Sequence, residues 1–299
     1  MNKLNPIKFR CSHRHNGVSH PACYLRYLQQ IKEYDESLLP KVLVFDIETS
    51  PLKAYVWQHS VWNANISEDK ILSEWYMLTW AAKWLYSDNV MSDRLAGKEA
   101  LAEDDSRIVK SLWKLLDEAD IVIAHNSVNF DVPNMNTRFI VNGLPPTTPY
   151  RILDTLKIAR KQFGFTHNNL NALARVFGFD AKLETNFDLW KRCVDGDDSA
   201  FKEMETYNIQ DVKLLEDVYL KLRPWIKSHP NLGLYIQSEN PVCPACGSDN
   251  IHIVENKFDY TNVSKFPLFR CDKCGAYARG RKNIIDKLVR DNLVRSVTR

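Results

Sequence analysis

The sequence lacks any long hydrophobic run. None of its apolar stretches approaches the ~20 residues of a transmembrane helix. Its first stretch, MNKLNPIKFRCSHRH, contains no apolar segment of the kind that a signal peptide requires. We therefore expect a cytosolic protein without a membrane partner. In that compartment the seven cysteines are better interpreted as metal ligands or free thiols than as disulfides.

A strong excess of charge is also missing from most of the chain. The formal net charge is +3, while the segment from Arg279 to Arg299 has seven basic and two acidic residues, or +5, which leaves −2 for the rest. A basic tail on a near-neutral body indicates either a polyanionic partner or a solvated helix end. With 299 residues, 44% of them hydrophobic, the chain is long enough for one large domain with small appendages.

The first stretch that carries chemistry is KVLVFDIETSP, residues 41–51. Its apolar run, residues 42–45, lies between prolines and predicts a buried strand. Asp46 and Glu48 are two residues apart, so their side chains share one face of the strand while Ile47 points to the other. The two carboxylates either share a divalent cation or form a solvated acidic pair at an exposed strand end.

Two later stretches supply further acids. Residues 121–124 predict a strand and residues 132–141 a helix, so Asp131 lies where a strand leads into a helix, as a functional acid or as a helix cap. Tyr207 and Asp211 are four residues apart in a predicted helix around residues 203–220, so they lie on one helix face. There they either hold a water and a metal or belong to an exposed face with a partly buried tyrosine.

The remaining periodicity predicts an α/β domain. Asp154 is expected to cap a helix and to have no chemical role. Further elements are predicted by apolar spacing and by β-branched and aromatic enrichment: helices over residues 24–36, 104–119, 152–160 and 170–177, and strands over residues 54–61 and 77–86.

Four cysteines near the end of the sequence occur in two C-x-x-C-G pairs, which predict a structural zinc site with a hairpin over residues 251–255 and 263–269. The ligands are Cys243, Cys246, Cys271 and Cys274. Three roles remain open for such a zinc ribbon: it stabilises a unit too small for its own core, it contacts protein, or it binds nucleic acid. Nucleic-acid binding would use the basic and aromatic surface of the ribbon together with the amphipathic helix expected in the basic tail. Cys193 has no partner at a suitable spacing and is expected to be a free thiol.

A second group of soft ligands lies within residues 11–23. Thiolate and imidazole together suit tetrahedral zinc, so we expect Cys11, His20 and Cys23 to bind it with one of His13 or His15. The spacing matches no standard zinc motif, and a polar loop with scattered histidines is the alternative.

In their order and separation, the three acidic stretches resemble the DnaQ-like 3′–5′ exonucleases of the RNase H-like superfamily. The matching residues are Asp46-Ile-Glu48, the segment from His125 to Asp131, and Tyr207-x-x-x-Asp211. The tyrosine is similar to that of the DEDDy branch, which includes polymerase proofreading domains and RNase D-like enzymes. The segments around Asp154 and residues 169–173 look like the family's middle region, and the addition of a four-cysteine module resembles phage-encoded stand-alone exonucleases.

The resemblance implies an RNase H-like mixed sheet flanked by helices over residues 41–230. Asp46, Glu48, Asp131 and Asp211 would hold two Mg²⁺ or Mn²⁺ ions, and Tyr207 would orient the attacking water. Thr49 and Asn126 would contact the terminal nucleotide. The other predicted parts are an N-terminal extension (1–40), a zinc ribbon (242–280) and a basic C-terminal helix (281–299).

The expected activity is removal of nucleoside 5′-monophosphates from single-stranded or frayed 3′ ends, on DNA more than RNA, in proofreading, replication or repair. A replicative polymerase acting in trans is a candidate partner, and a phage-encoded protein would work in the host cytoplasm. An RNase D-like RNA-trimming enzyme and an inactive nucleic-acid-binding protein remain as alternatives.

Overall fold

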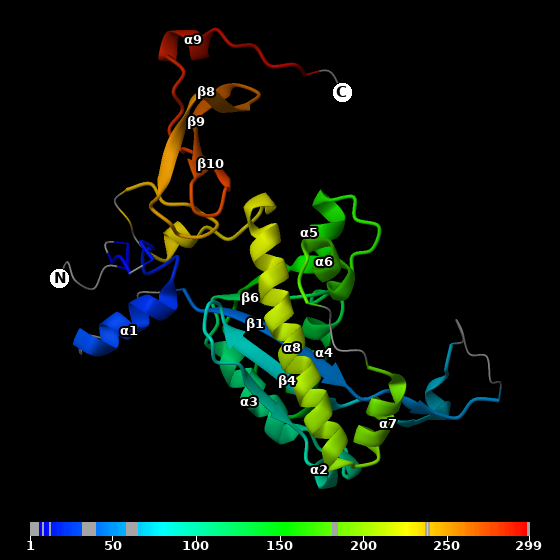
Figure 1. Cartoon of the computed structure of the whole chain (residues 1–299). Coiled ribbons are helices and arrows are strands. Elements are labelled where there is room, and N and C mark those ends of the chain that lie inside the picture. Colours follow the sequence, from blue (N-terminus) through cyan, green and yellow to red (C-terminus); the bar gives the residue numbers. More distant parts are fainter. Residues whose placement is uncertain are drawn as a thin grey trace. The chain divides into compact units, whose positions relative to one another are not determined.

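A computed structural model describes residues 6–297 of the chain, except residues 8, 12, 32–39, 58–64, 181–184, 237 and 239. The chain divides into two compact units (Figure 1). One comprises Lys41–Tyr219, and the other combines the two ends of the chain, Met1–Pro40 and Leu220–Arg299. We refer to them as the sheet unit and the end unit.

The sheet unit is built on five strands in the order β5-β4-β1-β6-β7. The strands are β1 (Val42–Thr49), β4 (Met77–Trp84), β5 (Met91–Arg94), β6 (Ile121–Ala124) and β7 (Arg151–Asp154). The β1–β4 and β4–β5 pairs are antiparallel, whereas β1–β6 and β6–β7 are parallel. All eight residues of β4 except the last are buried, as are all four of β6, which is typical of strands covered on both faces. The mixed α/β sheet expected from the sequence is confirmed.

Seven α-helices accompany this sheet among the described residues. They are α2 (Gly97–Leu101), α3 (Ser106–Asp117), α4 (Asp131–Val141), α5 (Thr155–Gln162), α6 (Leu170–Phe177), α7 (Phe187–Val194) and α8 (Asp198–Leu222). No helix in the described part of the chain combines the length and the apolar character that crossing a bilayer requires.

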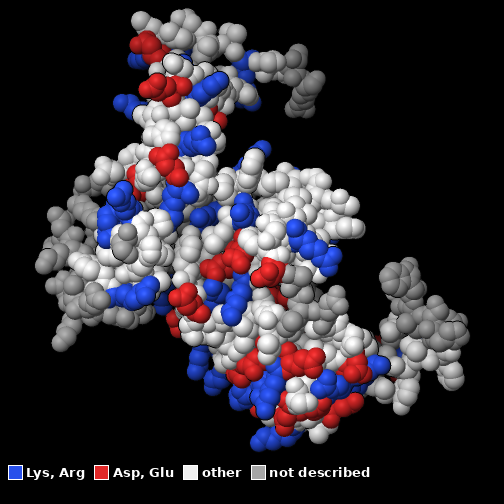
Figure 2. Space-filling view, viewed as in Figure 1, with Lys and Arg blue, Asp and Glu red and all other residues white. Residues whose placement is uncertain are grey.

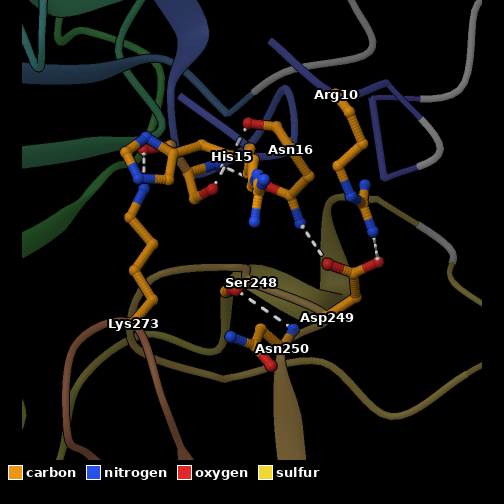
Figure 3. A pocket seen from close by; sticks show the side chains of 9 residues that line it. Arg10, His15, Asn16, Ser248, Asp249, Asn250 and Lys273 are labelled. Atoms are coloured by element: carbon orange, nitrogen blue, oxygen red, sulfur yellow. Dashed lines mark hydrogen bonds and ion pairs between the residues drawn. The ribbon is translucent and has the colours of Figure 1, made fainter. Parts of the chain in front are cut away.

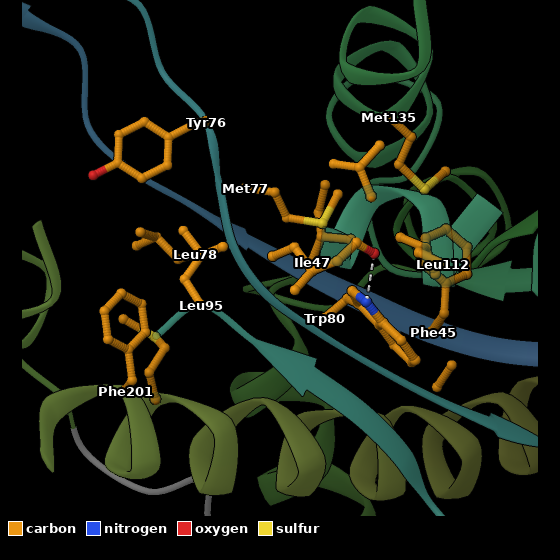
Figure 4. Packing of buried hydrophobic residues seen from close by; sticks show 14 of the residues in the cluster. Phe45, Ile47, Tyr76, Met77, Leu78, Trp80, Leu95, Leu112, Met135 and Phe201 are labelled. Carbon is orange, nitrogen blue, oxygen red and sulfur yellow. Dashed lines mark hydrogen bonds between the residues drawn. The ribbon is translucent and has the colours of Figure 1, made fainter. Parts of the chain in front are cut away.

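The core of the sheet unit packs one face of the sheet against helices α3 and α4, and it also includes residues of α7 and α8 such as Phe201 (Figure 4). Phe45 and Ile47 of β1 point into it, together with Leu112 of α3 and Met135 of α4. The indole of Trp80 donates a 2.9 Å hydrogen bond to the Ile108 carbonyl, which ties β4 to α3. Because Ile47 faces this core, its neighbours in β1 face the opposite side of the sheet.

Helix α8 covers that opposite side. Lys83 of β4 and Glu216 of α8 form a buried ion pair, and Glu216 also accepts a 2.7 Å hydrogen bond from the amide of Tyr86. Both charged groups are thus compensated where water is excluded. The pair fixes α8 against the sheet and so sets where its other residues meet β1.

Three of the shorter elements near the ends of the predicted ranges differ from expectation, and the end unit adds further differences described below. The predicted strand over residues 54–61 is only β2 (Lys53–Ala54), which pairs with β3 (Ile71–Ser73); residues 55–57 are irregular and residues 58–61 lie outside the described part. The helix predicted from residue 152 begins at Thr155, because Ile152–Asp154 pair with β6 as part of β7. The helix predicted over residues 24–36 is α1 (Pro21–Ile31), and residues 32–36 are not among those described.

The end unit contains α1 and a second sheet of three strands, in the order β10-β9-β8. Its strands are β8 (Ile251–Thr261), β9 (Ser264–Cys271) and β10 (Tyr277–Arg279). Short 3₁₀ turns occur at Glu68–Lys70 in the sheet unit and at Arg223–Trp225 and Leu232–Leu234 in the end unit. The hairpin expected between the two cysteine pairs is therefore present, with strands longer than the sequence predicted.

The basic tail forms a shorter helix than expected, α9 (Lys287–Asp291). Asn283 prevents an earlier start, because its side-chain oxygen accepts hydrogen bonds from the amides of Lys265 and Ile285. The amide of Ile284 also bonds to the Lys265 carbonyl, so this part of the tail lies along β9. The Asp286 side chain then caps α9 by accepting from the Leu288 amide at 2.8 Å.

Candidate active site

Three carboxylates meet where β1 ends under α8. Asp46 and Glu48 project from the same face of β1, and Asp211 comes from α8; one oxygen of each lies within 4.8 Å of the others. In an octahedral Mg²⁺ site with oxygens at about 2.1 Å, neighbouring ligands are about 3 Å apart and opposite ligands about 4.2 Å apart. The three groups are therefore close enough to share a hard cation, and they would repel one another without one.

Asp131 supplies a fourth carboxylate at the same end of β1. It is the first residue of α4 and only 1% exposed, and none of the described residues makes a hydrogen bond of normal geometry to either of its carboxylate oxygens. Burial raises the pKa of Asp131 to about 7, and the neighbouring backbone amide of Ile47 opposes this effect. Because Ile47 lies between Asp46 and Glu48, Asp131 lies beside the strand that carries them.

Tyr207 lies on α8 one turn before Asp211 and is 6% exposed. Its ring meets that of Trp190 from α7 edge to face, with centroids 6.2 Å apart. This packing fixes the plane of the phenol relative to the helix that carries Asp211.

Asn208 is a site residue that the sequence analysis missed. Its side-chain amide donates a 2.7 Å hydrogen bond to a carboxylate oxygen of Asp46, and the residue is completely buried. Such a bond orients a carboxylate and favours its charged form. Only its position directly after Tyr207 in the third acidic stretch could have drawn attention to it.

Asp154 organises the turn that leads to Asp131. Its carboxylate caps α5 at the amides of Leu156 and Lys157, as expected, and also accepts from the amides of Asn126 and Val128 at 3.1 Å. The sequence pattern predicts the cap but not this second role. Asp154 therefore holds the loop between β6 and α4 in place.

The two predicted substrate contacts come from different segments. Thr49 is the half-buried last residue of β1, directly after a bulge in the pairing with β4. Asn126 has a φ of 70°, a left-handed conformation that asparagine adopts more readily than most residues. Both positions stay predictions for contact with a nucleotide.

His125, next to this turn, is fixed by Thr155. The Thr155 hydroxyl lies 3.2 Å from the Ala124 carbonyl, to which it donates, and 2.8 Å from Nδ1 of His125. Which of the two groups donates in this second bond follows the tautomer of the imidazole.

The outer surface of the sheet unit carries both signs of charge. Figure 2 shows acidic and basic side chains intermingled over the region formed by α2 and α7. Arg107 illustrates the pattern, because it pairs with Asp93 at 2.6 Å and with Glu99 at 2.8 Å. These contacts with the guanidinium lower the pKa of Glu99 to about 2.

A second group of metal-ligand type, the ribbon cluster, consists of Cys243, Cys246, Cys271 and Cys274 in the end unit. The sulfurs of Cys243 and Cys274 are 3.6 Å apart, as are those of Cys246 and Cys271. Sulfurs at 2.3 Å from a tetrahedral zinc are about 3.8 Å apart, so the arrangement fits a zinc ribbon. Gly247 and Gly275, which follow the two pairs, have φ of 69° and 78°, a conformation that tight turns use and glycine adopts readily.

The strands beyond the ribbon cluster present aromatic rings next to cations. The Lys265 ammonium lies 3.7 Å from the centroid of the Phe258 ring, and the Arg279 guanidinium lies 4.7 Å from that of Phe266. Tyr260 and Tyr277 are 64% and 58% exposed. This surface combines the stacking and charge that single-stranded nucleic acid requires.

A third group, the N-terminal cluster, consists of Cys11, His13, His20 and Cys23. The sequence left open whether His13 or His15 would join the other three, and the structure brings His13 into the group. Cys193 is a free buried thiol, as predicted, and burial raises its pKa to about 12.

The sheet and the carboxylate site define an RNase H-like nuclease fold, a class that uses divalent metals. The chain belongs to the RNase_H superfamily, whose family model matches residues 43–223. No curated protein matches the chain in sequence.

Among solved structures, the chain is similar to the family B DNA polymerase from the hyperthermophilic archaeon Pyrobaculum calidifontis, with 18% identity and a TM-score of 0.46. The match covers 62% of this chain and 25% of the polymerase chain. The matched part of the chain spans about a quarter of the length of that polymerase chain.

Proposed function

We propose that the protein is a metal-dependent 3′–5′ exonuclease of the DEDDy type, which removes nucleoside 5′-monophosphates from single-stranded or frayed DNA 3′ ends. The observation that supports this proposal is the meeting of Asp46, Glu48 and Asp211 at one end of β1, with Asp131 buried beside them. These residues come from three separate elements, and all carry the oxygen ligands that Mg²⁺ or Mn²⁺ prefers.

Each side chain then has a distinct task. The four carboxylates are suited to hold two cations, which when bound would stabilise the attacking and leaving oxygens of an in-line displacement at phosphorus. Asn208 keeps one oxygen of Asp46 directed by its hydrogen bond. Tyr207, packed against Trp190, orients the attacking water; a phenol with a pKa near ~10 is a weak base at neutral pH, so positioning is its larger contribution.

The end unit contributes nucleic-acid binding in this proposal. The ribbon cluster holds one structural zinc, and the exposed tyrosines and cations of the second sheet contact the strand outside the active site. A role in proofreading, replication or repair, with a polymerase acting in trans, is consistent with a nuclease that carries its own binding surface.

An end-label assay tests the proposal. With Mg²⁺ present, a 3′ label on single-stranded DNA should be released as a mononucleotide at the first turnover, whereas a 5′ label should yield a ladder of shortening products. Release first from the 5′ end, cleavage of a circular strand, or binding without cleavage would contradict it. A matched RNA strand separates the DNA enzyme from an RNase D-like one, because faster trimming of RNA would overturn the DNA assignment.

A further inference from the structure

The N-terminal cluster has the geometry of a tetrahedral metal site. A zinc ion with sulfur at 2.3 Å and nitrogen at about 2.05 Å places each sulfur about 3.6 Å from each nitrogen. Here Sγ of Cys11 lies 3.4 Å from Nδ1 of His20 and 3.7 Å from Nδ1 of His13, and Sγ of Cys23 lies 4.0 Å from Nδ1 of His13. Three measured edges therefore match those of a Cys₂His₂ tetrahedron.

The surroundings of the cluster fit structural zinc. Cys23 lies in the first turn of α1, and the Arg26 guanidinium lies 3.8 Å from its sulfur, where it would stabilise a thiolate. Three of the four ligand residues are half-buried, and only His13 is exposed.

The N-terminal segment, by which we mean the described part of residues 6–31, carries this cluster and is folded against the ribbon cluster. Asn16 is buried and donates to the Gly247 carbonyl at 3.2 Å and to Asp249 at 3.1 Å. Gly247 approaches Val18 so closely that a Cβ at this glycine would lie 2.0 Å from Cγ1 of Val18. The close approach joins residues that are more than 200 positions apart, within one compact unit.

We propose that the N-terminal cluster is a second structural zinc site, and that zinc there folds the N-terminal segment onto the ribbon to form one module with two metals. The apolar contacts described for this segment are small: Ile7 and Val18 pack with Ile236 and Val242, and Tyr24 packs with Phe9. A metal is the usual source of stability for so small a unit. The module thus joins the two ends of the chain. In the sequence, the residues of the sheet unit lie between these ends.

Metal analysis of the full-length protein tests this proposal. The purified protein should contain two zinc ions per chain, and the double variant Cys11→Ser, Cys23→Ser should contain one. Cys193→Ser is the matched control, because that thiol is free and buried, and it should retain two. Trypsin should cleave after Arg14 at least about tenfold faster in the double variant, while the sheet unit is digested at an unchanged rate.

The two neighbouring histidines provide a sharper comparison. His13→Asn should speed the loss of one zinc to a chelator by at least about tenfold, whereas His15→Asn should leave the rate of zinc loss unchanged. Cobalt-substituted wild-type protein offers a readout without mutation, because its visible spectrum should contain a two-thiolate and a four-thiolate component. A single zinc that survives the Cys11, Cys23 double variant, a cobalt spectrum with the four-thiolate component alone, or equal zinc loss in both histidine variants would overturn the proposal.

A separate observation concerns a cavity of about 290 Å³ between the N-terminal segment and the ribbon (Figure 3). Arg10, Arg14 and Lys273 line it together with His15, and Asp249 is the only acid in the lining. Asp249 is already paired with Arg10, and Lys273 donates to the Ser19 carbonyl. The lining therefore carries a net charge of about +2, and Arg14, with a φ of 60°, is held there in an uncommon backbone conformation.

We infer that this pocket binds a backbone phosphate of the nucleic acid. Two uncompensated positive charges and several neutral donors suit a phosphodiester, and the volume exceeds that of one phosphate group. The inference rests on the proposed nuclease function for the identity of the ligand. It also gives the end unit a defined contact, separate from the exposed rings of the second sheet.

Binding of a fluorescent single-stranded DNA to the full-length protein, with Ca²⁺ in place of Mg²⁺, tests the pocket. Arg14→Gln should weaken binding at least about threefold at low salt and reduce the slope of log K against log salt by about 0.7. Lys110→Gln, which removes the same charge from an exposed position on α3, should change neither. Binding is measured without cleavage, so this test fails or succeeds independently of the exonuclease assignment.

Two results would overturn this inference. One is an affinity and salt slope for Arg14→Gln equal to those of Lys110→Gln. The other is thermal stabilisation by inorganic phosphate that depends on Arg14 while DNA affinity does not, which would make the pocket a site for the free anion.

Discussion

Asn208 of α8 donates a 2.7 Å hydrogen bond to Asp46 of β1, and so connects the third acidic stretch of the sequence to the first. Asn208 is completely buried, and it lies on the same helix as Asp211 and Tyr207. The amide of Asn208 gives one oxygen of Asp46 a hydrogen-bond donor. Because this amide is neutral, it does not replace a cation as the partner of the carboxylate charge. This relationship makes Asn208 a positioning residue for the proposed metal centre.

Replacement of Asn208 by alanine should lower turnover and metal affinity by about 10- to 100-fold, because the loss of a bond that orients a metal ligand has effects of this size. The measurement is the Mg²⁺ dependence of 3′-end release. Gln210→Ala, at an exposed position on the same helix, is the control and should behave like the wild type. An unchanged Mg²⁺ dependence in Asn208→Ala would show that Asp46 is held by other contacts.

Removal of one carboxylate from the centre should abolish turnover while sparing the fold. In Asp211→Asn the loss should be about 1000-fold or more, since the metals supply several kcal/mol to the transition state. Without metal, the melting temperature should stay equal or rise, because the substitution relieves repulsion among three clustered acids. Unfolding of the variant would mean that Asp211 is structural.

Asp131 should make the metal-free protein less stable as the pH rises. Its pKa is about 7 in the folded protein, against an ordinary value of 3.8, so between these values the folded state binds more protons than the unfolded state. Stability therefore falls as pH increases from about 4 to 7, by up to about 4 kcal/mol at 1.36 kcal/mol per pKa unit.

Thermal unfolding of the metal-free protein at pH 5 and pH 8 measures this effect. Asp131→Asn should melt above the wild type at pH 8, and the advantage should shrink at pH 5. Added Mg²⁺ should stabilise the wild type at pH 8 more than the variant. A variant that is less stable than the wild type at pH 8 without metal would contradict the prediction.

The sequence predicted the elements that carry the acids because their signals are local. The apolar run before Asp46 predicts a strand and the spacing of apolar residues around Asp211 predicts a helix, each from neighbouring residues alone. The structure contains both elements, as β1 and α8. The three acids of these two elements do converge, yet no local pattern required it. Their meeting depends on α8 crossing the sheet, which the buried contact of Lys83 with Glu216 helps to fix.

The features that the sequence missed depend on contacts between distant segments. Ile152–Asp154 continue the helical spacing of residues 155–160, but pairing with β6 makes them a strand. In the tail, the side chain of Asn283 bonds to β9 and shortens the expected helix. The choice of His13 over His15 likewise depends on how residues 11–23 fold against the ribbon, which ligand spacing alone does not determine.

The buried ion pair between Asp105 and Arg138 connects the β4 end of the sheet to α4. The guanidinium donates twice to the carboxylate, at 2.6 Å each, and Asp105 also accepts from the Met77 amide at 2.9 Å and from Asn142 at 3.0 Å. Asp105 is completely buried, so loss of its charge would leave several donors without an acceptor.

Asp105→Ala should therefore lower the free energy of unfolding by about 3–5 kcal/mol, the cost of breaking a buried pair by removing one partner. Glu118→Gln, which breaks the ion pair with Lys41 at the surface, should change it by less than about 1 kcal/mol. Denaturant unfolding of both variants gives the comparison. If the two variants lose the same small amount of stability, the contacts of Asp105 contribute little, and apolar packing such as that of the buried Met135 and Phe139 holds α4 in place.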